Sequence, residues 1–209
     1  LARVPGLSAD VVEQSRVLGQ DTKPPTVSDA LLNIIVHLCL ALAAPGVAVL
    51  VFLPGSSEID ELCELLQCAL PVLQEKSLGV EEAVICCLHG FAMAAQTERI
   101  FSDVPAQEFR VVLSTNIGES SLTLPGIRYV IDCGISRQSG VATLSGSTVL
   151  VDEWCSLDSC IQRRGRTGRL FPGSCFFLFP RSVWDSVLPD HGNDFATVAS
   201  VGHAYLRAT

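Results

Sequence analysis

The sequence is poor in basic residues. Lys and Arg together number 14 against 22 Asp and Glu, which leaves a formal net charge of −8 at pH 7. A chain with this balance does not attract nucleic acid by bulk charge, so any such binding must be local. Charged residues make up 17% of the chain and hydrophobic residues 48%. That composition excludes disorder over most of the length.

Long apolar runs are also absent. The longest candidate, residues 31–46, contains Asn33 and His37 and stops at Pro45, short of the ~20 apolar residues that a membrane span needs. It predicts a buried helix, in which His37 is a satisfied core or interface residue. No signal-peptide pattern opens the chain, and we expect no membrane association. Because the first residue is Leu1, we expect the chain to be part of a longer protein.

The nine cysteines show no C-x-x-C spacing, and the closest pair is Cys86–Cys87. An odd count within apolar segments favours buried, reduced thiols over a disulfide framework, although a zinc or redox site stays open. We therefore expect an intracellular protein without a metal site of its own, with the cytoplasm favoured over the nucleus.

Apolar runs alternate with helix-like segments along the chain. The runs "VAVLVFL" and "FRVVLST" are typical of strands buried on both faces, and alternation of such strands with helices predicts a parallel sheet with helices on both faces. The fold class is therefore α/β. The expected strands are 47–53, 83–89, 109–115, 127–132 and 173–179. The expected helices start at Thr26 or Ser28, at Ser56 or Ser57, at Met93 and near Ser156.

One α/β domain, residues 26–182, accounts for nearly all of this pattern. Residues 1–25 lack a clear period and end in "KPP", which predicts a linker or leading segment. Residues 133–153 are rich in Gly, Ser and Thr and predict an extended β-hairpin. We expect residues 183–209 to be a C-terminal extension towards a following domain.

The loop after the 109–115 strand, "TNIGESSLT", is crowded with hydroxyls and an amide. In open parallel sheets, ligands gather where loops leave the carboxyl ends of the strands. Donors in this loop could therefore hold phosphates. The alternative is an ordinary capped turn, since Ser, Thr and Asn favour turns.

Residues 161–170, "IQRRGRTGRL", hold four arginines within an acidic chain. A continuous helix would place Gln162, Arg166 and Arg169 on one side, at i, i+4 and i+7, with Arg163 and Arg164 pointing elsewhere. Like charges at that spacing repel, so the helix is either a solvated face or one directed at an anion. Arginine forks match phosphate oxygens, which makes a polyphosphate the natural partner.

Taken together, these segments carry a family resemblance. "LSTNIGESSLTLPGIRYVID" followed by "QRRGRTGR" resembles motifs V and VI of the DEAH/RHA helicases, and "VFLPGSSEID" resembles their motif IV. The stretch "LHG…Q…RIF" and the strand "PGSCFFLF" fit the same family in order and spacing. The resemblance covers roughly residues 45–180. The "LPG" after the motif IV strand and Pro125 lean towards the branches carrying Tudor or YTH modules.

The resemblance implies the second RecA-like domain of an ATP-dependent RNA helicase, with residues 26–182 as the helicase C-terminal domain. ATP with Mg²⁺ would bind in the cleft with a preceding RecA-like domain, which holds the metal. Arg166 and Arg169 would be arginine fingers on the γ-phosphate, and Gln162 would position the nucleotide or the attacking water. An arginine supplied across such a cleft is worth ~10³–10⁵ in rate.

Further roles follow from the same resemblance. It implies nucleotide contacts from Phe101, Ser121 and Thr123 and contacts to the single-stranded RNA backbone from Ser114, Thr115 and Asn116. Phe101 would stack on the base; its alternative is a core residue that ends an amphipathic helix. Backbone contacts of this kind do not separate RNA from DNA, so DNA stays open.

The sequence also departs from the family. Gly118-Glu119-Ser120 stands where "AET" is usual, and Pro125 replaces an Asp that contacts the ribose, which puts nucleotide selectivity in doubt. There is neither a G-x-x-x-x-G-K-S/T P-loop nor a D-E-A-H sequence, so we expect no ATP hydrolysis from this chain alone. The rival function is an inactive RNA clamp or scaffold. A phosphate-binding metabolic enzyme would need an acid–base constellation that the sequence lacks.

Overall fold

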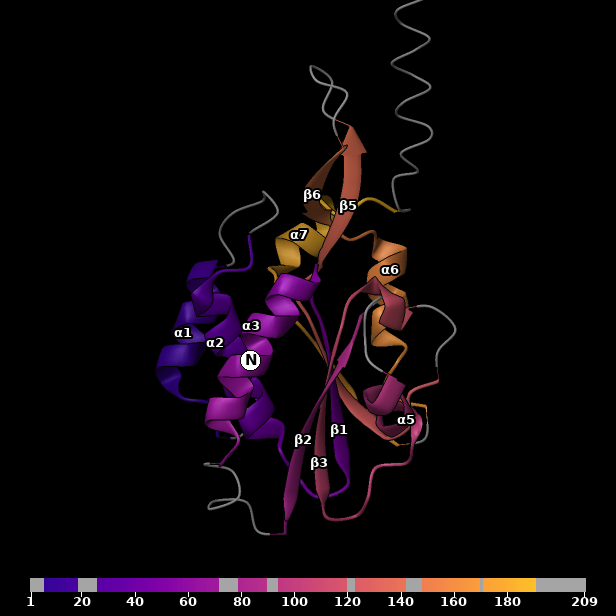
Figure 1. The fold of residues 1–209 in the computed structure, drawn as a ribbon. Coiled ribbons are helices and arrows are strands. Elements are labelled where there is room, and N and C mark those ends of the chain that lie inside the picture. Colours follow the sequence, from indigo (N-terminus) through magenta and orange to yellow (C-terminus); the bar gives the residue numbers. More distant parts are fainter. Residues whose placement is uncertain are drawn as a thin grey trace, which may run out of the picture.

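The computed structural model describes residues 6–18, 26–71, 79–89, 94–119, 123–141, 148–169 and 171–190. Its centre is a five-stranded sheet in the order β2-β3-β1-β4-β7, with every neighbouring pair parallel. The parallel α/β fold predicted from the sequence is confirmed (Figure 1). The strands are β1 (Val47–Phe52), β2 (Glu82–Leu88), β3 (Glu108–Ser114), β4 (Ile127–Asp132) and β7 (Ser174–Phe177).

The two central strands are buried along their whole length. In β1 and β3 every residue is buried, as their continuous apolar runs predict for strands covered on both faces. Their register pairs Val47 with Phe109 and Phe52 with Ser114. All five strands consequently end at one carboxyl edge of the sheet, where the candidate site lies.

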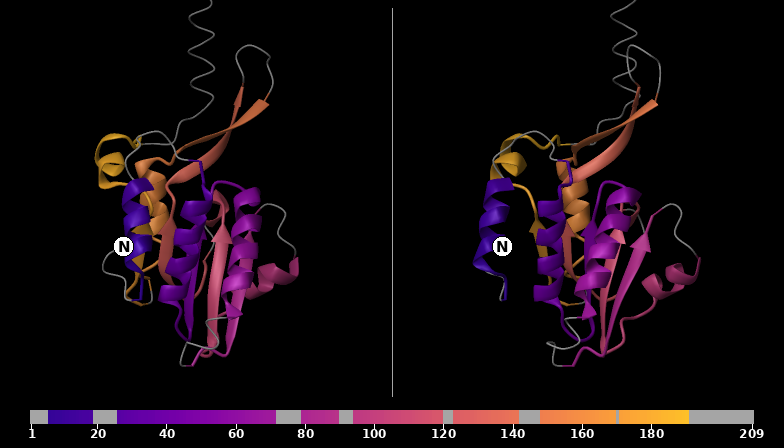
Figure 2. Two further views of the ribbon diagram at one scale, coloured as in Figure 1. Left: turned by 90° about the vertical axis from the view of Figure 1, so that its left-hand side faces the viewer. Right: turned by 60° about the vertical axis from the view of Figure 1, so that its left-hand side comes forward.

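Helices cover both faces of the sheet, as Figures 1 and 2 show. On one face lie α1 (Ala9–Leu18), α2 (Asp29–Leu42) and α3 (Ser56–Ala69), and on the other lie α5 (Ala94–Phe101) and α6 (Leu157–Arg164). The first face holds the larger core cluster, and the α5 face holds a smaller one that includes Phe52 and Ile100. The Ser28 hydroxyl caps α2 by accepting from the Leu31 N–H at 3.3 Å, which confirms the predicted helix start.

Helix α1 was not predicted. The sequence indicated only a linker or leading segment there, because its hydrophobic pattern is weak. In the structure the helix packs on α2, and Val11 is 5% exposed within the larger core. Among the residues of α1 whose burial is described, Val11 is the buried one, and a signal of that size is too small to detect by periodicity.

Helix α6 ends earlier than predicted. A helix continuing through Arg169 is wrong, since α6 stops at Arg164 with Gly165 as its C-cap. Gly168 has a φ of +76°, a left-handed conformation that glycine adopts without steric cost and that no helix contains. Gln162, Arg166 and Arg169 therefore do not share one helical face, and the last two lie on the loop that follows α6.

The predicted hairpin is present as β5 (Ile135–Val141) and β6 (Thr148–Trp154), paired antiparallel, and it rises beyond the carboxyl edge of the sheet (Figure 2). One arginine ties it to the body. The Arg137 guanidinium donates to Asp152 of the hairpin at 2.7 and 2.9 Å and to Glu58 of α3 at 2.7 and 3.0 Å. Motif IV and the hairpin are thus joined by one ion-pair network.

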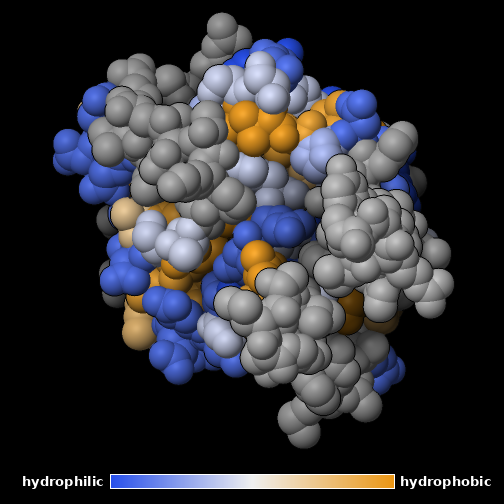
Figure 3. Space-filling model, turned by 90° about the horizontal axis from the view of Figure 1, so that it is seen from above, coloured by the Kyte–Doolittle hydropathy of each residue, from blue (hydrophilic) through white to orange (hydrophobic). Residues whose placement is uncertain are grey.

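Two short helices complete the described elements: the 3₁₀ helix η1 (Asn116–Glu119) after β3, and α7 (Arg181–Ser186) after β7. Seen from the hairpin end, the surface shows apolar patches between hydrophilic side chains (Figure 3). Val149, Leu150 and Val151 of β6 are exposed by 44%, 65% and 41%. No helix in the described part of the chain is both long and apolar enough to cross a bilayer.

Candidate nucleotide and nucleic-acid site

The loop predicted to contact nucleic acid lies at the carboxyl end of β3. Ser114 is fully buried and its hydroxyl donates to the Thr115 carbonyl at 2.9 Å, so in this structure it supports the loop from inside. Thr115 is half-buried, and Asn116 is exposed at the start of η1. Thr115 and Asn116 are therefore the members of this group whose side chains reach the surface.

Gly118 allows η1 to lie close against the sheet. A Cβ atom at this position would lie 2.6 Å from Ser114 Oγ and 3.0 Å from Phe52 Cε1. Both distances are shorter than ordinary van der Waals contact. The Gly118 N–H donates to the Thr115 carbonyl at 3.1 Å, which closes the turn. Glycine in place of the family's usual alanine therefore has a packing reason in this chain.

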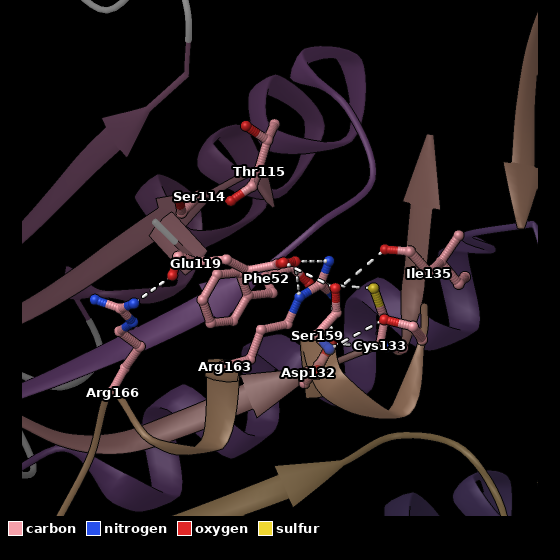
Figure 4. A network of polar contacts seen from close by, with 12 residues as sticks. Phe52, Ser114, Thr115, Glu119, Asp132, Cys133, Ile135, Ser159, Arg163 and Arg166 are labelled. Atoms are coloured by element: carbon pink, nitrogen blue, oxygen red, sulfur yellow. Dashed lines mark hydrogen bonds and ion pairs between the residues drawn. The ribbon is translucent and has the colours of Figure 1, made fainter. Parts of the chain in front are cut away.

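Behind the loop lies a buried network centred on Arg163, which is 1% exposed (Figure 4). Its guanidinium donates to Glu119 Oε1 at 2.5 Å and to Asp132 Oδ1 at 2.8 Å. It also lies 4.9 Å from the centroid of the Phe52 ring, in cation–π geometry. Arg163 thus joins α6 to η1, β4 and β1.

The charges in this network compensate one another. Burial alone would lower the pKa of Arg163, but the carboxylates of Asp132 and Glu119 raise it well above its ordinary value. Asp132 Oδ1 also accepts the Gly134 N–H at 2.8 Å, whereas Asp132 Oδ2 is buried without a hydrogen-bond partner among the described residues. A carboxylate so placed depends on the arginine for its charge compensation.

Arg166, the first predicted arginine finger, lies beside this network. Its Nη2 donates to the backbone carbonyl of Glu119, as Figure 4 shows. Burial, and then the nearby charge of Arg169, lower the pKa of Arg166. An anion arriving here would relieve that repulsion. Arg166 is therefore placed where a phosphate would find a half-buried guanidinium next to the motif V loop.

The other two residues of the predicted catalytic set are exposed. Arg169 donates from Nε to the Gly165 carbonyl at 3.1 Å, and Gln162 lies on the outer face of α6. Arg166 and Arg169 come from the same loop, so the structure brings the two predicted fingers together although not by a shared helix face.

The predicted nucleotide residues Phe101 and Thr123 are both exposed on the α5 side of the sheet. Their sequence neighbours Ile100 and Leu124 both pack in the smaller core, so the two segments adjoin the same part of the molecule. Phe101 is 38% exposed, which is more than a core aromatic would be. Ser121 lies outside the described residues.

A second buried ion cluster fixes the end of α5. Glu108 accepts from Arg110 Nε at 2.6 Å and from Arg99 Nη2 at 2.7 Å. Arg110 also donates to the carbonyl of Ser102 at 2.8 Å. Arg99 and Ser102, on either side of Phe101, are therefore both bound to residues at the start of β3.

Sequence reasoning missed the roles of Arg163, Glu119 and Asp132. Arg163 was expected to point away from the site, because a single helix was assumed to continue through the motif. One signal was available: Asp132 ends an otherwise apolar buried strand, and a buried acid requires a cationic or hydrogen-bonding partner. Nothing in the sequence says which arginine supplies it.

Comparison with known proteins shows the family. The family described as the helicase conserved C-terminal domain matches residues 29–171. The chain belongs to that family. The helicase C-terminal domain of this protein is 40% identical over 145 residues to the ATP-dependent RNA helicase TDRD9 of Mus musculus, covering 69% of this chain and 10% of that protein. It is 35% identical over 155 residues to the DExH-box ATP-dependent RNA helicase DExH3 of Arabidopsis thaliana, covering 74% and 12%.

Among solved structures, the domain resembles the E. coli DExH-box NTPase HrpB with a TM-score of 0.65 and 26% identity. That likeness covers 90% of this chain and 24% of the solved one. The helicase C-terminal domain thus spans about a tenth of the length of the curated relatives above and a quarter of the solved structure. The resemblance to DExH-type RNA helicases and the RecA-like fold are confirmed.

Proposed function

We propose that this domain is the second motor domain of an ATP-dependent RNA helicase. The observation that carries the proposal is the contact between the Arg166 guanidinium and the Glu119 carbonyl, which joins motif VI to motif V directly. Both relatives named above are ATP-dependent RNA helicases by name. Segments that resemble the family's motifs IV, V and VI occur in this chain in that order.

In this proposal Arg166 and Arg169 reach the γ-phosphate of ATP across a cleft with the preceding RecA-like domain. Phosphoryl transfer spreads negative charge over oxygens, and guanidinium groups fixed at that position stabilise it. Gln162, exposed beside them, positions the nucleotide or water, and Phe101 and Thr123 contact the rest of the nucleotide. Ser121 is assigned to the same group. In this proposal Mg²⁺ is held by the preceding RecA-like domain.

Single-stranded RNA is the proposed second partner. Thr115 and Asn116 hold its backbone at the carboxyl edge of the sheet, and Ser114 supports them through its hydrogen bond. Contacts to the backbone let a motor step along a strand without reading its sequence. The TDRD9 relatives favour the Tudor side of the two branches, and an intracellular, cytoplasmic location stays a prediction.

The test is ATP hydrolysis by a protein that contains this domain together with the RecA-like domain expected before it. Turnover is measured with and without single-stranded RNA for the wild type, Arg166→Ala and Arg169→Ala. We expect RNA-stimulated turnover that falls by about 10³-fold or more in either variant. Arg164→Ala, an exposed arginine of the same motif, is the matched control and keeps wild-type turnover.

A second function, an RNA clamp without turnover, is favoured by Pro125, which replaces the acid expected to contact the ribose. In that case the wild type binds RNA but hydrolyses ATP negligibly. The three arginine variants then show the same negligible ATP turnover as the wild type. This result would remove the motor function and retain the RNA-binding one.

A further inference from the structure

Glu119 is shared by three groups that belong to different parts of the proposed site. Its Oε1 accepts from Arg163 at 2.5 Å, and its Oε2 accepts from the Ser159 hydroxyl at 3.0 Å. Its backbone carbonyl accepts from Arg166. The Glu119 side chain therefore binds the buried Arg163, while its backbone binds Arg166, the predicted finger.

Glu119 also ends the 3₁₀ turn that begins at Asn116, the predicted RNA contact. Four residues in one turn leave little freedom between the two ends. The turn is pressed against the sheet at Gly118, where a Cβ would lie 2.6 Å from Ser114 Oγ. A displacement at Asn116 is therefore passed to Glu119 instead of being absorbed by the loop.

Arg163, which binds Glu119 at the end of the turn, is itself held in place by the core. It is 1% exposed and bound to Asp132 Oδ1 at 2.8 Å, to the Ile135 carbonyl at 3.4 Å and to the Phe52 ring face at 4.9 Å. Those contacts anchor it to β4, to the start of β5 and to β1. Figure 4 shows the arginine between Glu119 and Asp132, with Arg166 on the opposite side of Glu119.

We propose that Glu119, held by Arg163, is a positioning residue that couples RNA binding at Thr115 and Asn116 to the placement of Arg166. In this structure Arg166 is directed at the Glu119 carbonyl. When RNA shifts the 3₁₀ turn, that carbonyl moves relative to the anchored Arg163, and the Arg166 guanidinium is re-aimed towards the phosphate. Glu119 and Arg163 touch neither ATP nor RNA. The inference rests on the proposed motor function.

The experiment measures an RNA stimulation factor, defined as ATP turnover with saturating single-stranded RNA divided by turnover without RNA. It uses the protein with both RecA-like domains and the variant Glu119→Gln, which removes the charge that Arg163 binds. The matched control is Asp152→Asn. Asp152 is another arginine-bound carboxylate, with a side chain 20% exposed against 14% for Glu119, but it lies in the hairpin.

We expect Glu119→Gln to lower the stimulation factor by about 2- to 30-fold, the usual range for residues that couple two sites, and Asp152→Asn to leave it unchanged. A purely structural role predicts something else: the two variants would lose melting temperature while both keep the wild-type factor. That outcome overturns the proposal, as does an equal loss of stimulation in both variants.

Ser159→Ala tests the same coupling if the Glu119→Gln protein fails to fold. This variant removes only the hydroxyl that is bound to Glu119 Oε2. It should lower the factor in the same direction, and an unchanged factor counts against the coupling. A wild type without ATP turnover would refute the motor function separately. The coupling is then tested by measuring the affinity for a non-hydrolysable ATP analogue with and without RNA. RNA should change this affinity in the wild type and leave it unchanged in Glu119→Gln.

Discussion

The guanidinium of Arg163 lies 4.9 Å above the Phe52 ring and bridges the carboxylates of Glu119 and Asp132. A side chain that was predicted to point away from Gln162, Arg166 and Arg169 is thus the most buried cation of motif VI. Its neighbour Arg164 is exposed. The two adjacent arginines therefore offer a direct contrast between a structural charge and a surface one.

Replacing Arg163 should be costly to stability. Arg163→Ala leaves two carboxylates without their buried partner, and breaking a buried pair in this way costs about 3–5 kcal/mol in free energy of unfolding. Arg164→Ala, at the exposed neighbour, should stay within about 0.5 kcal/mol of the wild type. Urea denaturation at pH 7 measures both. Equal values for the two variants would contradict the network.

Gly118→Ala tests the packing of the motif V turn. The added Cβ meets Ser114 Oγ and Phe52 Cε1 at 2.6 and 3.0 Å, and such overpacking costs about 1–3 kcal/mol. Ser114→Ala added to Gly118→Ala removes the closer of these atoms, so the double variant should recover part of the loss. Thermal unfolding of the two single variants and the double variant gives the interaction energy. If the stability losses of the two single variants simply add up in the double variant, the contact between residues 118 and 114 is contradicted.

The hairpin should loosen when its arginine is removed. Arg137→Ala breaks the ion pair to Asp152 within the hairpin and the ion pair to Glu58, which links the hairpin to α3. We expect faster amide hydrogen exchange in β5 and β6, with exchange in β1 and β3 unchanged. Arg128→Ala, an arginine exposed on β4, serves as the control. Unchanged hairpin exchange in Arg137→Ala would show that the two strands hold their position without it.

Phe101→Leu tests the base-stacking role. Stacking of a base on an aromatic ring is worth about 1–3 kcal/mol, so the variant should raise KM for ATP by about 5- to 150-fold in the protein with both RecA-like domains. Because the ring is 38% exposed, the melting temperature should change little. Phe171→Leu, at a phenylalanine that is 61% exposed, is the control. A loss of stability at constant KM would favour the core role instead.

The buried thiol of Cys39 should make the folded state less stable at alkaline pH. Burial raises the pKa of Cys39 from 9.0 to about 12, so the folded state keeps this thiol protonated where the unfolded chain ionises. Its contribution to stability is present below pH 9 and is lost as the pH rises towards 12, by at most about 1.4 kcal/mol per pH unit.

Denaturant unfolding between pH 8 and 11 checks this point. The wild-type free energy of unfolding should fall with pH, and Cys39→Ala should show a shallower slope than the wild type. Cys68 is exposed, so Cys68→Ala should keep the wild-type slope. Parallel slopes for wild type and Cys39→Ala would contradict the assignment.

The sequence predicted the sheet well because each strand is marked locally. The run at 127–132 matches β4 at both ends, and Pro54-Gly55 separates β1 from α3 where expected. Buried strands must be apolar and the turns between them need Gly or Pro, so composition alone carries this information. The sequence therefore determined which segments are strands, and the strand order came from the structure.

The site was less predictable, since its polar contacts join distant positions. Arg163 and Asp132 are 31 residues apart in the sequence, and no spacing rule relates them. The end of α6 depends on Gly168 taking a positive φ, a choice that helical periodicity does not register. The sequence motifs predicted which arginines act as fingers and which loop contacts RNA, whereas the packing beneath these residues is seen only in the structure.

The strand order also has a consequence for synthesis on the ribosome. Val47 in the central strand pairs with Phe109, 62 positions later, and its other neighbour β4 comes later still. At about 5–20 residues per second, the nascent chain carries an unpaired "VAVLVF" segment for several seconds. Such a segment has high β-propensity and no charge, which makes it prone to associate with other chains. This domain should therefore depend on chaperones most during the interval before β3 has been made.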